Sequence, residues 1–150
     1  MSLYYLSIGS NIESEKHIPE AVRLLRETFS VKKISSVYET PPFGSAEGDN
    51  FWNLVLCLET ETEADDLRRQ LAEIEKKLGR VKGLNKYAPR TIDLDLLPKL
   101  EYQKQAFVVV PFAEIAPELR DPESDKTIGE LAASLRGEAD AFKKISSLRV

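Results

Sequence analysis

Two helix-type segments, each bracketed by strand-type segments, restrict the fold of this chain more than any other feature of its sequence. Residues 14–28 and 64–78 repeat apolar side chains at helical spacing, and Ser14 can cap the first segment. Strand-type runs precede and follow them at residues 3–9, 31–38, 51–59 and 91–97. This order predicts an α+β fold of the ferredoxin-like βαββαβ type.

In such a fold the sheet is antiparallel and both helices pack on one face, so the other face is free to carry a site. After residue 97 we expect a further buried strand at Phe107–Val110, a short helical turn around Glu114 and a last helix at Ile128–Leu135. With 150 residues, we expect residues 1–150 to form a single domain.

Composition limits the partners. The net charge of −4 argues against broad nucleic-acid binding, and no apolar run approaches the ~18 residues of a membrane span. One cysteine, Cys57, excludes an internal disulfide framework and favours a reducing, cytoplasmic setting. We therefore expect a cytoplasmic monomer that binds neither nucleic acid nor membrane. The one histidine, His17, is expected on the surface of the first helix.

Positive charge is concentrated between Lys76 and Arg90, which hold six basic residues and no acidic one. Such an island in an acidic chain favours a small polyanion that is held locally. A solvated basic loop is the alternative, because exposed runs of charge are common on protein surfaces.

Two carboxylates stand close together in the segment from Arg90 to Leu97. Side chains alternate along a strand, so Asp93 and Asp95 face one side about 6–7 Å apart at a rise of ~3.3 Å per residue. A divalent cation offsets two like charges at this spacing, and oxygen ligands favour magnesium. An exposed strand face paired with nearby lysines remains the alternative. Arg90 favours the first interpretation, because an anion site beside a cation site suits a metal–nucleotide complex.

A second group of residues can hold a flat ring. Phe51 and Asn53 share a strand face, near Thr40 and Phe43 in the preceding loop. An aromatic ring can stack on a heteroaromatic ligand while an amide reads its polar edge. The alternative is that both phenylalanines belong to an ordinary core.

Taken together, the chain resembles the 6-hydroxymethyl-7,8-dihydropterin pyrophosphokinase family of folate biosynthesis. The matching segments are Ile8–Asn11, Tyr38–Gly44, Phe51–Asn53, Leu78–Val81, Ala88–Leu97 and Pro111–Pro122. The resemblance implies transfer of pyrophosphate from ATP to the hydroxymethyl oxygen of the pterin, with release of AMP. It also implies two magnesium ions bound with ATP.

The resemblance assigns roles to individual residues. It places the pterin between Phe51 and Phe107, and the other substrate-binding residues it implies are Thr40, Pro41, Phe43 and Asn53. It makes Asp93 and Asp95 the metal ligands and, with Arg80 and Arg90, the catalytic residues. The nucleotide-binding residues that it implies are Glu75, Arg80, Lys82, Tyr87 and Arg90.

The chain departs from the family on the nucleotide side. The connection between Asp95 and Phe107 has eleven residues, whereas family members have a longer one that carries a histidine and an arginine. Lys99 and Lys104 lie in the shortened connection, and either could replace the arginine. Weaker ATP binding and slower turnover are therefore expected. A pterin-binding homologue that is non-catalytic or has altered specificity is the alternative function.

Overall fold

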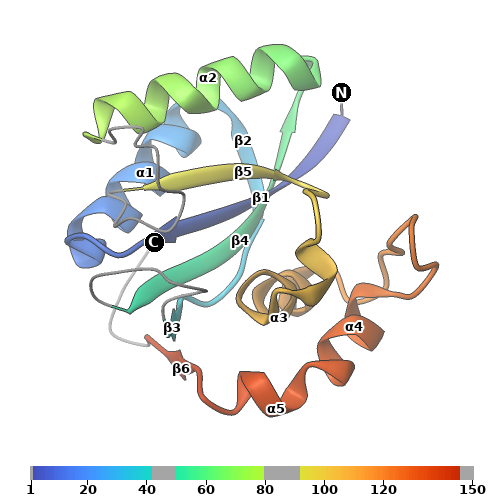
Figure 1. Ribbon diagram of the computed structural model, residues 1–150. Helices are drawn as coiled ribbons and strands as arrows, with labels where there is room; N and C mark the ends of the chain where they lie inside the picture. The colour runs from blue at the N-terminus through green and yellow to red at the C-terminus, as the bar shows by residue number, and fades with distance from the viewer. Residues whose placement is uncertain (1, 42–49, 80–91, 146–150) are drawn as a thin grey trace.

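The computed structural model describes residues 2–41, 50–79 and 92–145, which form one antiparallel sheet with helices on both faces (Figure 1). The strands are β1 (Ser2–Ser10), β2 (Ser30–Ile34), β3 (Tyr38–Thr40), β4 (Phe51–Thr60), β5 (Asp93–Leu97) and β6 (Lys143–Lys144). The helices are α1 (Ser14–Thr28), α2 (Ala64–Lys77), α3 (Ala106–Ile115), α4 (Ile128–Ser134) and α5 (Arg136–Ala139), with a 3-10 turn η1 (Tyr102–Lys104). Within these residues, no helix is long and apolar enough to cross a membrane.

The sheet has the strand order β5-β1-β4-β3-β6. Strand β2 pairs with residues 56–59 of β4, whereas β3 pairs with residues 51–53 of the same strand. Every strand pair is antiparallel. The two chain-distant strands β1 and β5 thus lie side by side, as the ferredoxin-like order requires. The predicted α+β fold class is confirmed.

The main core lies between the sheet and the helices α1 and α2, which share one face (Figure 1). Alternate residues of the three neighbouring strands stand in register on this face. Leu6 lies opposite Leu56 and Leu96, and Ile8 lies opposite Leu54 and Leu94. Side chains two positions apart along a strand point to the same face, so each strand contributes its apolar set to this core.

His17 belongs to this core side of α1, which corrects its predicted place on the surface. Its side chain is buried, and Nδ1 lies 2.6 Å from the carbonyl oxygen of Ile12. Ser14, Ile18 and Ala21 are also buried, so the buried stripe of the helix passes through position 17. The ring therefore packs against the turn between β1 and α1.

The opposite face of the sheet is covered in part, because the predicted strand at Phe107–Val110 is wrong. These residues belong to the helix α3, which packs against β4 and carries Phe112 to within 5.1 Å of Tyr5, between ring centres. The segment is apolar on nearly every side, and such a run has no periodicity that separates a buried helix from a buried strand. The local sequence favours a strand, because three valines precede Pro111. The packing of α3 against the sheet overrides that preference.

A break divides the predicted strand at residues 31–38 into β2 and β3. Ser35 lies in the break, and its hydroxyl accepts a hydrogen bond from the Val55 N–H at 2.9 Å. The Ser35 N–H in turn donates to the Val55 carbonyl at 2.9 Å. One side chain thus replaces a backbone partner of β4, and the chain bends without leaving a buried amide unpaired.

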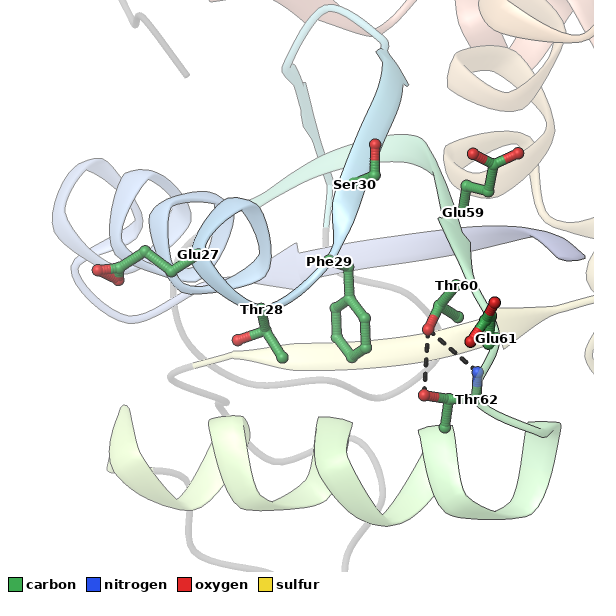
Figure 2. A pocket seen from close by; sticks show the side chains of 8 residues that line it. All are labelled: Glu27, Thr28, Phe29, Ser30, Glu59, Thr60, Glu61 and Thr62. Atoms are coloured by element: carbon green, nitrogen blue, oxygen red, sulfur yellow. Dashed lines mark hydrogen bonds between the residues drawn. The ribbon is translucent and has the colours of Figure 1, made fainter. Parts of the chain in front are cut away.

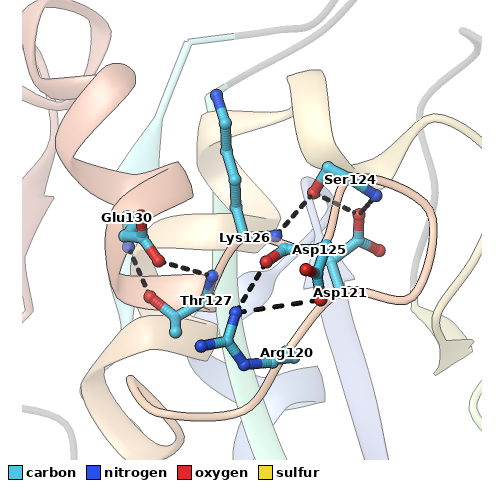
Figure 3. Close-up of polar contacts among 7 residues, drawn as sticks. All are labelled: Arg120, Asp121, Ser124, Asp125, Lys126, Thr127 and Glu130. Atoms are coloured by element: carbon cyan, nitrogen blue, oxygen red, sulfur yellow. Dashed lines mark hydrogen bonds and ion pairs between the residues drawn. The ribbon is translucent and has the colours of Figure 1, made fainter.

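The segment between α3 and α4 is held by a network of polar contacts (Figure 3). Buried Asp121 accepts hydrogen bonds from the Ser124 N–H and hydroxyl and from the Tyr102 hydroxyl. Thr127 and Glu130 cap each other's backbone at the start of α4, where the predicted helix at Ile128–Leu135 is confirmed. This network anchors η1 and α4 beneath the sheet.

Candidate functional site

Polar side chains line one row across the sheet face that α1 and α2 do not cover. Asp93 of β5 lies opposite Gly9 of β1, Gly9 lies opposite Asn53 of β4, and Asn53 lies opposite Tyr38 of β3. Residues directly opposite in register share a face, so four strands contribute to this row. The predicted carboxylate strand and the predicted ring-binding strand therefore meet across Gly9.

Asp93 and Asp95 project from the same face of β5, as the alternation predicted. The neighbours of Asp95 set its charge. Burial raises the pKa of the Asp95 carboxyl, and the nearby Asp93 raises it further, whereas Lys99 acts in the opposite direction. The Lys99 ammonium lies 3.2 Å from Asp95 Oδ2. A second cation close to this carboxylate would favour its charged form.

Strand β5 places two acidic donors, Asp93 and Asp95, on this face of the sheet. Among residues 2–41, 50–79 and 92–145, no cluster of three or more histidine, cysteine or acidic side chains could enclose a metal ion. Magnesium keeps several waters and is bound through one or two carboxylates together with phosphate oxygens. The donor set of Asp93 and Asp95 fits a magnesium ion that arrives with a nucleotide.

Glu75 fixes the strand that carries both aspartates. It lies on α2 with a buried side chain, and Oε2 accepts a hydrogen bond of 2.8 Å from the Leu94 backbone N–H. Leu94 stands between Asp93 and Asp95 on an edge strand, where its N–H would otherwise lack a strand partner. The sequence resemblance placed Glu75 near the nucleotide, and the structure shows it supporting the backbone between the two aspartates.

The amide of Asn53 is held in one orientation. Asn53 Nδ2 donates a 2.7 Å hydrogen bond to Thr40 Oγ1, and both side chains are buried. With the nitrogen directed to β3, the oxygen is directed to β1: a Cβ built on Gly9 would lie 3.0 Å from Asn53 Oδ1. Glycine at position 9 therefore leaves the space that this amide occupies.

The aromatic residues predicted to hold a ring come from different elements. Phe51 is half-buried at the start of β4, on the face of Asn53, and Pro41 is exposed just after β3. Phe107 lies on α3, and its ring centre is 5.9 Å from the Lys99 ammonium. Lys99 thus lies between the carboxylate strand and the helix that carries Phe107. Sequence reasoning named Lys99 only as one of two substitutes.

Glu114 is a residue of this region to which the sequence analysis gave no role. From α3 it accepts hydrogen bonds from the Ser36 N–H at 2.7 Å, the Ser36 hydroxyl at 2.8 Å and the Tyr38 hydroxyl. Burial alone would raise the pKa of Glu114, but the hydrogen bonds from Tyr38 and Ser36 lower it overall. Burial, followed by the bond to Glu114, raises the pKa of Tyr38. Glu114 thus fastens β3, and with it Thr40, to α3.

The remaining predicted site residues are Phe43, Arg80, Lys82, Tyr87 and Arg90, and all of them lie outside the described residues.

A hollow at the far end of β4 does not suit an anionic ligand (Figure 2). It lies beside Glu59 and Thr60, at the opposite end of the ten-residue strand from Phe51 and Asn53. The residues that line it are Glu27, Thr28, Phe29, Ser30, Glu59, Thr60, Glu61 and Thr62. Three carboxylates without a basic side chain among these residues would repel a triphosphate.

Residues 5–117 match the family of 7,8-dihydro-6-hydroxymethylpterin-pyrophosphokinase. The chain belongs to this family. The curated 2-amino-4-hydroxy-6-hydroxymethyldihydropteridine pyrophosphokinase of Aquifex aeolicus is 32% identical over 145 residues, which cover 87% of this chain and 90% of the relative. The pyrophosphokinase of the same name from Pseudomonas aeruginosa is 35% identical over 148 residues, with the same two coverages of 87% and 90%. The resemblance stated from the sequence is confirmed.

Solved structures of the same family share the fold. A crystal structure of HPPK-DHPS in complex with substrates superposes with a TM-score of 0.78 at 10% identity and covers 96% of this chain. HPPK-DHPS of Plasmodium falciparum, in its A437G form, gives a TM-score of 0.75 at 12% identity and covers 95% of the chain. This chain spans about half the length of either protein, at 48% and 46%. At these identities the likeness supports the fold alone.

Proposed function

We propose that this chain transfers pyrophosphate from ATP to 6-hydroxymethyl-7,8-dihydropterin and releases AMP. Family membership and the names of the relatives support this activity. The observation that carries it to specific residues is the row from Asp93 through Gly9 to Asn53. A carboxylate pair suited to a metal–nucleotide complex and an amide suited to a pterin edge lie on the same face of one sheet.

The pterin half of the proposed site uses the fixed amide. Asn53 presents its oxygen to a ring N–H, while Thr40 holds the amide nitrogen and so prevents the amide from turning. Phe51 and Phe107 enclose the ring, and Pro41 and Phe43 complete the pocket wall. A buried, oriented amide discriminates between ligands because a ligand without the matching donor leaves it unpaired.

The part of the proposed site that binds the nucleotide, called the nucleotide half, does so through charged side chains. Asp93 and Asp95 would hold magnesium, and the metal, when bound, would neutralise charge on the transferred group. Arg80, Lys82, Tyr87 and Arg90 contact the nucleotide. Glu75 keeps the two aspartates at their spacing through its bond to Leu94. Phosphoryl chemistry depends on this positioning and neutralisation more than on a covalent intermediate.

In the reaction the hydroxymethyl oxygen of the pterin forms a bond to the β-phosphorus of ATP. The bond from that phosphorus to the bridging oxygen of the α-phosphate breaks, and the oxygen leaves with AMP. The hydroxyl proton of the pterin is released to solvent water. The attacking pterin oxygen, the β-phosphorus and the leaving oxygen must therefore lie in line. Binding of both substrates on one sheet face allows this arrangement.

The proposal extends to the organisation and the setting of the protein. We infer that the chain acts as one domain and as a monomer, and that it does so in the cytoplasm without nucleic-acid or membrane partners. The buried thiol of Cys57 is compatible with a reducing setting.

Product analysis tests the proposed function. Purified protein is incubated with ATP, magnesium and the reduced pterin, and nucleotide products are separated by chromatography. We expect AMP in equal amount to pterin pyrophosphate. ADP instead of AMP would indicate transfer of a single phosphate. Pterin binding without either product would favour the alternative, a non-catalytic pterin-binding homologue.

A further inference from the structure

Lys99 joins the two halves of the proposed site. Its ammonium lies 3.2 Å from Asp95 Oδ2 and 5.9 Å from the centre of the Phe107 ring. The Lys99 side chain is 26% exposed and the Asp95 side chain 37% exposed, so solvent reaches both groups. An ammonium group in this position faces β5, which carries Asp95, on one side and α3, which carries Phe107, on the other.

The backbone keeps Lys99 at this place. It follows β5 by two residues, and its carbonyl accepts a hydrogen bond of 3.2 Å from the Tyr102 N–H. Tyr102 is itself buried, and its hydroxyl donates to Asp121 at 2.7 Å. The short connection between β5 and α3 therefore presents its first lysine to the site while its backbone is anchored.

Lys104 does not share this position. It lies in η1 with an exposed side chain, and no ion pair joins it to any residue in the described part of the chain. The two lysines in the shortened connection thus differ in what they face. Only Lys99 reaches a predicted metal ligand.

Asp95 cannot serve Lys99 and a magnesium ion equally well. A metal bound to this carboxylate brings its two positive charges close to the ammonium, and the two cations repel each other. A polyphosphate between them removes the repulsion, because its oxygens bind the metal and accept hydrogen bonds from the lysine. The ammonium is then released from Asp95 toward the phosphates.

We propose that Lys99 is a phosphate-binding residue of the nucleotide half, and that it serves as the counter-ion of Asp95 until the metal–nucleotide complex binds. The inference rests on the proposed function, since it assigns a further residue to that reaction. It makes metal binding depend on the nucleotide, because the lysine competes with metal alone and cooperates with metal plus phosphate.

Calorimetric titration of the wild type and its lysine variants tests this without turnover. Wild-type protein, Lys99→Met and the control Lys104→Met are each titrated with Mn²⁺ alone. Each is then titrated with α,β-methylene ATP in saturating Mg²⁺, because this analogue cannot be cleaved between its α- and β-phosphates. We expect Lys99→Met to bind Mn²⁺ alone more tightly and the analogue about tenfold or more weakly. Lys104→Met should match the wild type in both titrations, and Lys99→Arg should restore most of the analogue affinity.

The outcomes separate the inference from the proposed function. If Lys99→Met binds the analogue as the wild type does, Lys99 is no phosphate ligand and the inference is wrong, while the proposed function stands. If the wild type itself binds no analogue in the presence of Mg²⁺, the proposed function fails, and this assignment of Lys99 fails with it. Equal loss in Lys99→Met and Lys104→Met would mean that general positive charge is responsible, which also overturns the inference.

Discussion

Replacing Gly9 by alanine should damage pterin binding without destabilising the fold. The new Cβ would lie 3.0 Å from Asn53 Oδ1, whereas 3.4 Å is an ordinary contact distance. The amide oxygen must therefore retreat by a few tenths of an ångström. Its nitrogen is fixed by the 2.7 Å bond to Thr40, so the amide either turns away from the pterin edge or weakens that bond.

The size of the effect follows from leaving one polar group poorly paired in a buried site. Such a loss costs about 1–3 kcal/mol, which raises the pterin dissociation constant by roughly fivefold to more than a hundredfold. The fold should keep its stability, because Gly9 does not adopt a positive φ and the ~0.5–1 kcal/mol gained by replacing a strand glycine offsets the weaker Asn53–Thr40 bond. Pterin affinity is thus expected to fall while the stability of the fold stays close to that of the wild type.

Fluorescence titration with the pterin and thermal unfolding measure the two quantities. Gly137→Ala is a matched control, since a Cβ there would meet no atom within 4 Å and the residue lies far from the row, in α5. Pterin affinity in Gly9→Ala equal to that of the wild type and the control would refute the assigned orientation of Asn53.

The other predictions concern the groups that hold the site in place. Asn53→Ala should weaken pterin binding by about 1–3 kcal/mol in the same titration, with turnover at saturating pterin changed far less. Glu114→Gln should raise KM for the pterin more than it lowers kcat, because it loosens β3 and Thr40, and an unchanged KM would contradict the role given to Glu114. Asp121→Asn should flatten the acid limb of a stability profile. Burial acts to raise the pKa of Asp121, but its hydrogen bonds lower it below the ordinary value near 3.8, so its contribution is present at neutral pH and is lost as the pH falls through the lowered value. Acid unfolding as steep as in the wild type would disprove that assignment.

The sequence predicted those helices and strands whose formation follows from a single local pattern, either helical spacing or strand alternation of apolar residues. The first helix, Ser14–Thr28, ends as predicted because its apolar spacing is regular. The predicted cap is wrong: Glu13 holds the N-cap position, and Ser14 is the first helical residue, whose hydroxyl donates to the Ser10 carbonyl. The strand at Asp93–Leu97 lies within the predicted range 91–97, and acidic and apolar residues alternate in it from Asp93 to Leu96. The shared face of Asp93 and Asp95 needed nothing beyond that alternation.

Tertiary packing decided the parts that the sequence did not predict. Phe107–Val110 is helical because α3 is buried on several sides against β4 and α4, and no local pattern records this burial. The face expected to be free is therefore covered in part by α3. Glu114 and Lys99 gained their roles only through contacts between segments that are distant in sequence or joined by a turn. A buried stripe passing through His17 was the one missed feature with a visible signal, since position 17 follows Ser14 by three residues and precedes Ala21 by four.

The central claim is that the carboxylate pair serves the nucleotide half and leaves the pterin half intact. The most direct test is Asp95→Ala, measured for AMP release and for pterin affinity in the same preparation. The account predicts loss of turnover with a pterin dissociation constant close to that of the wild type. Full turnover in Asp95→Ala, or a pterin affinity that falls together with the rate, would contradict it.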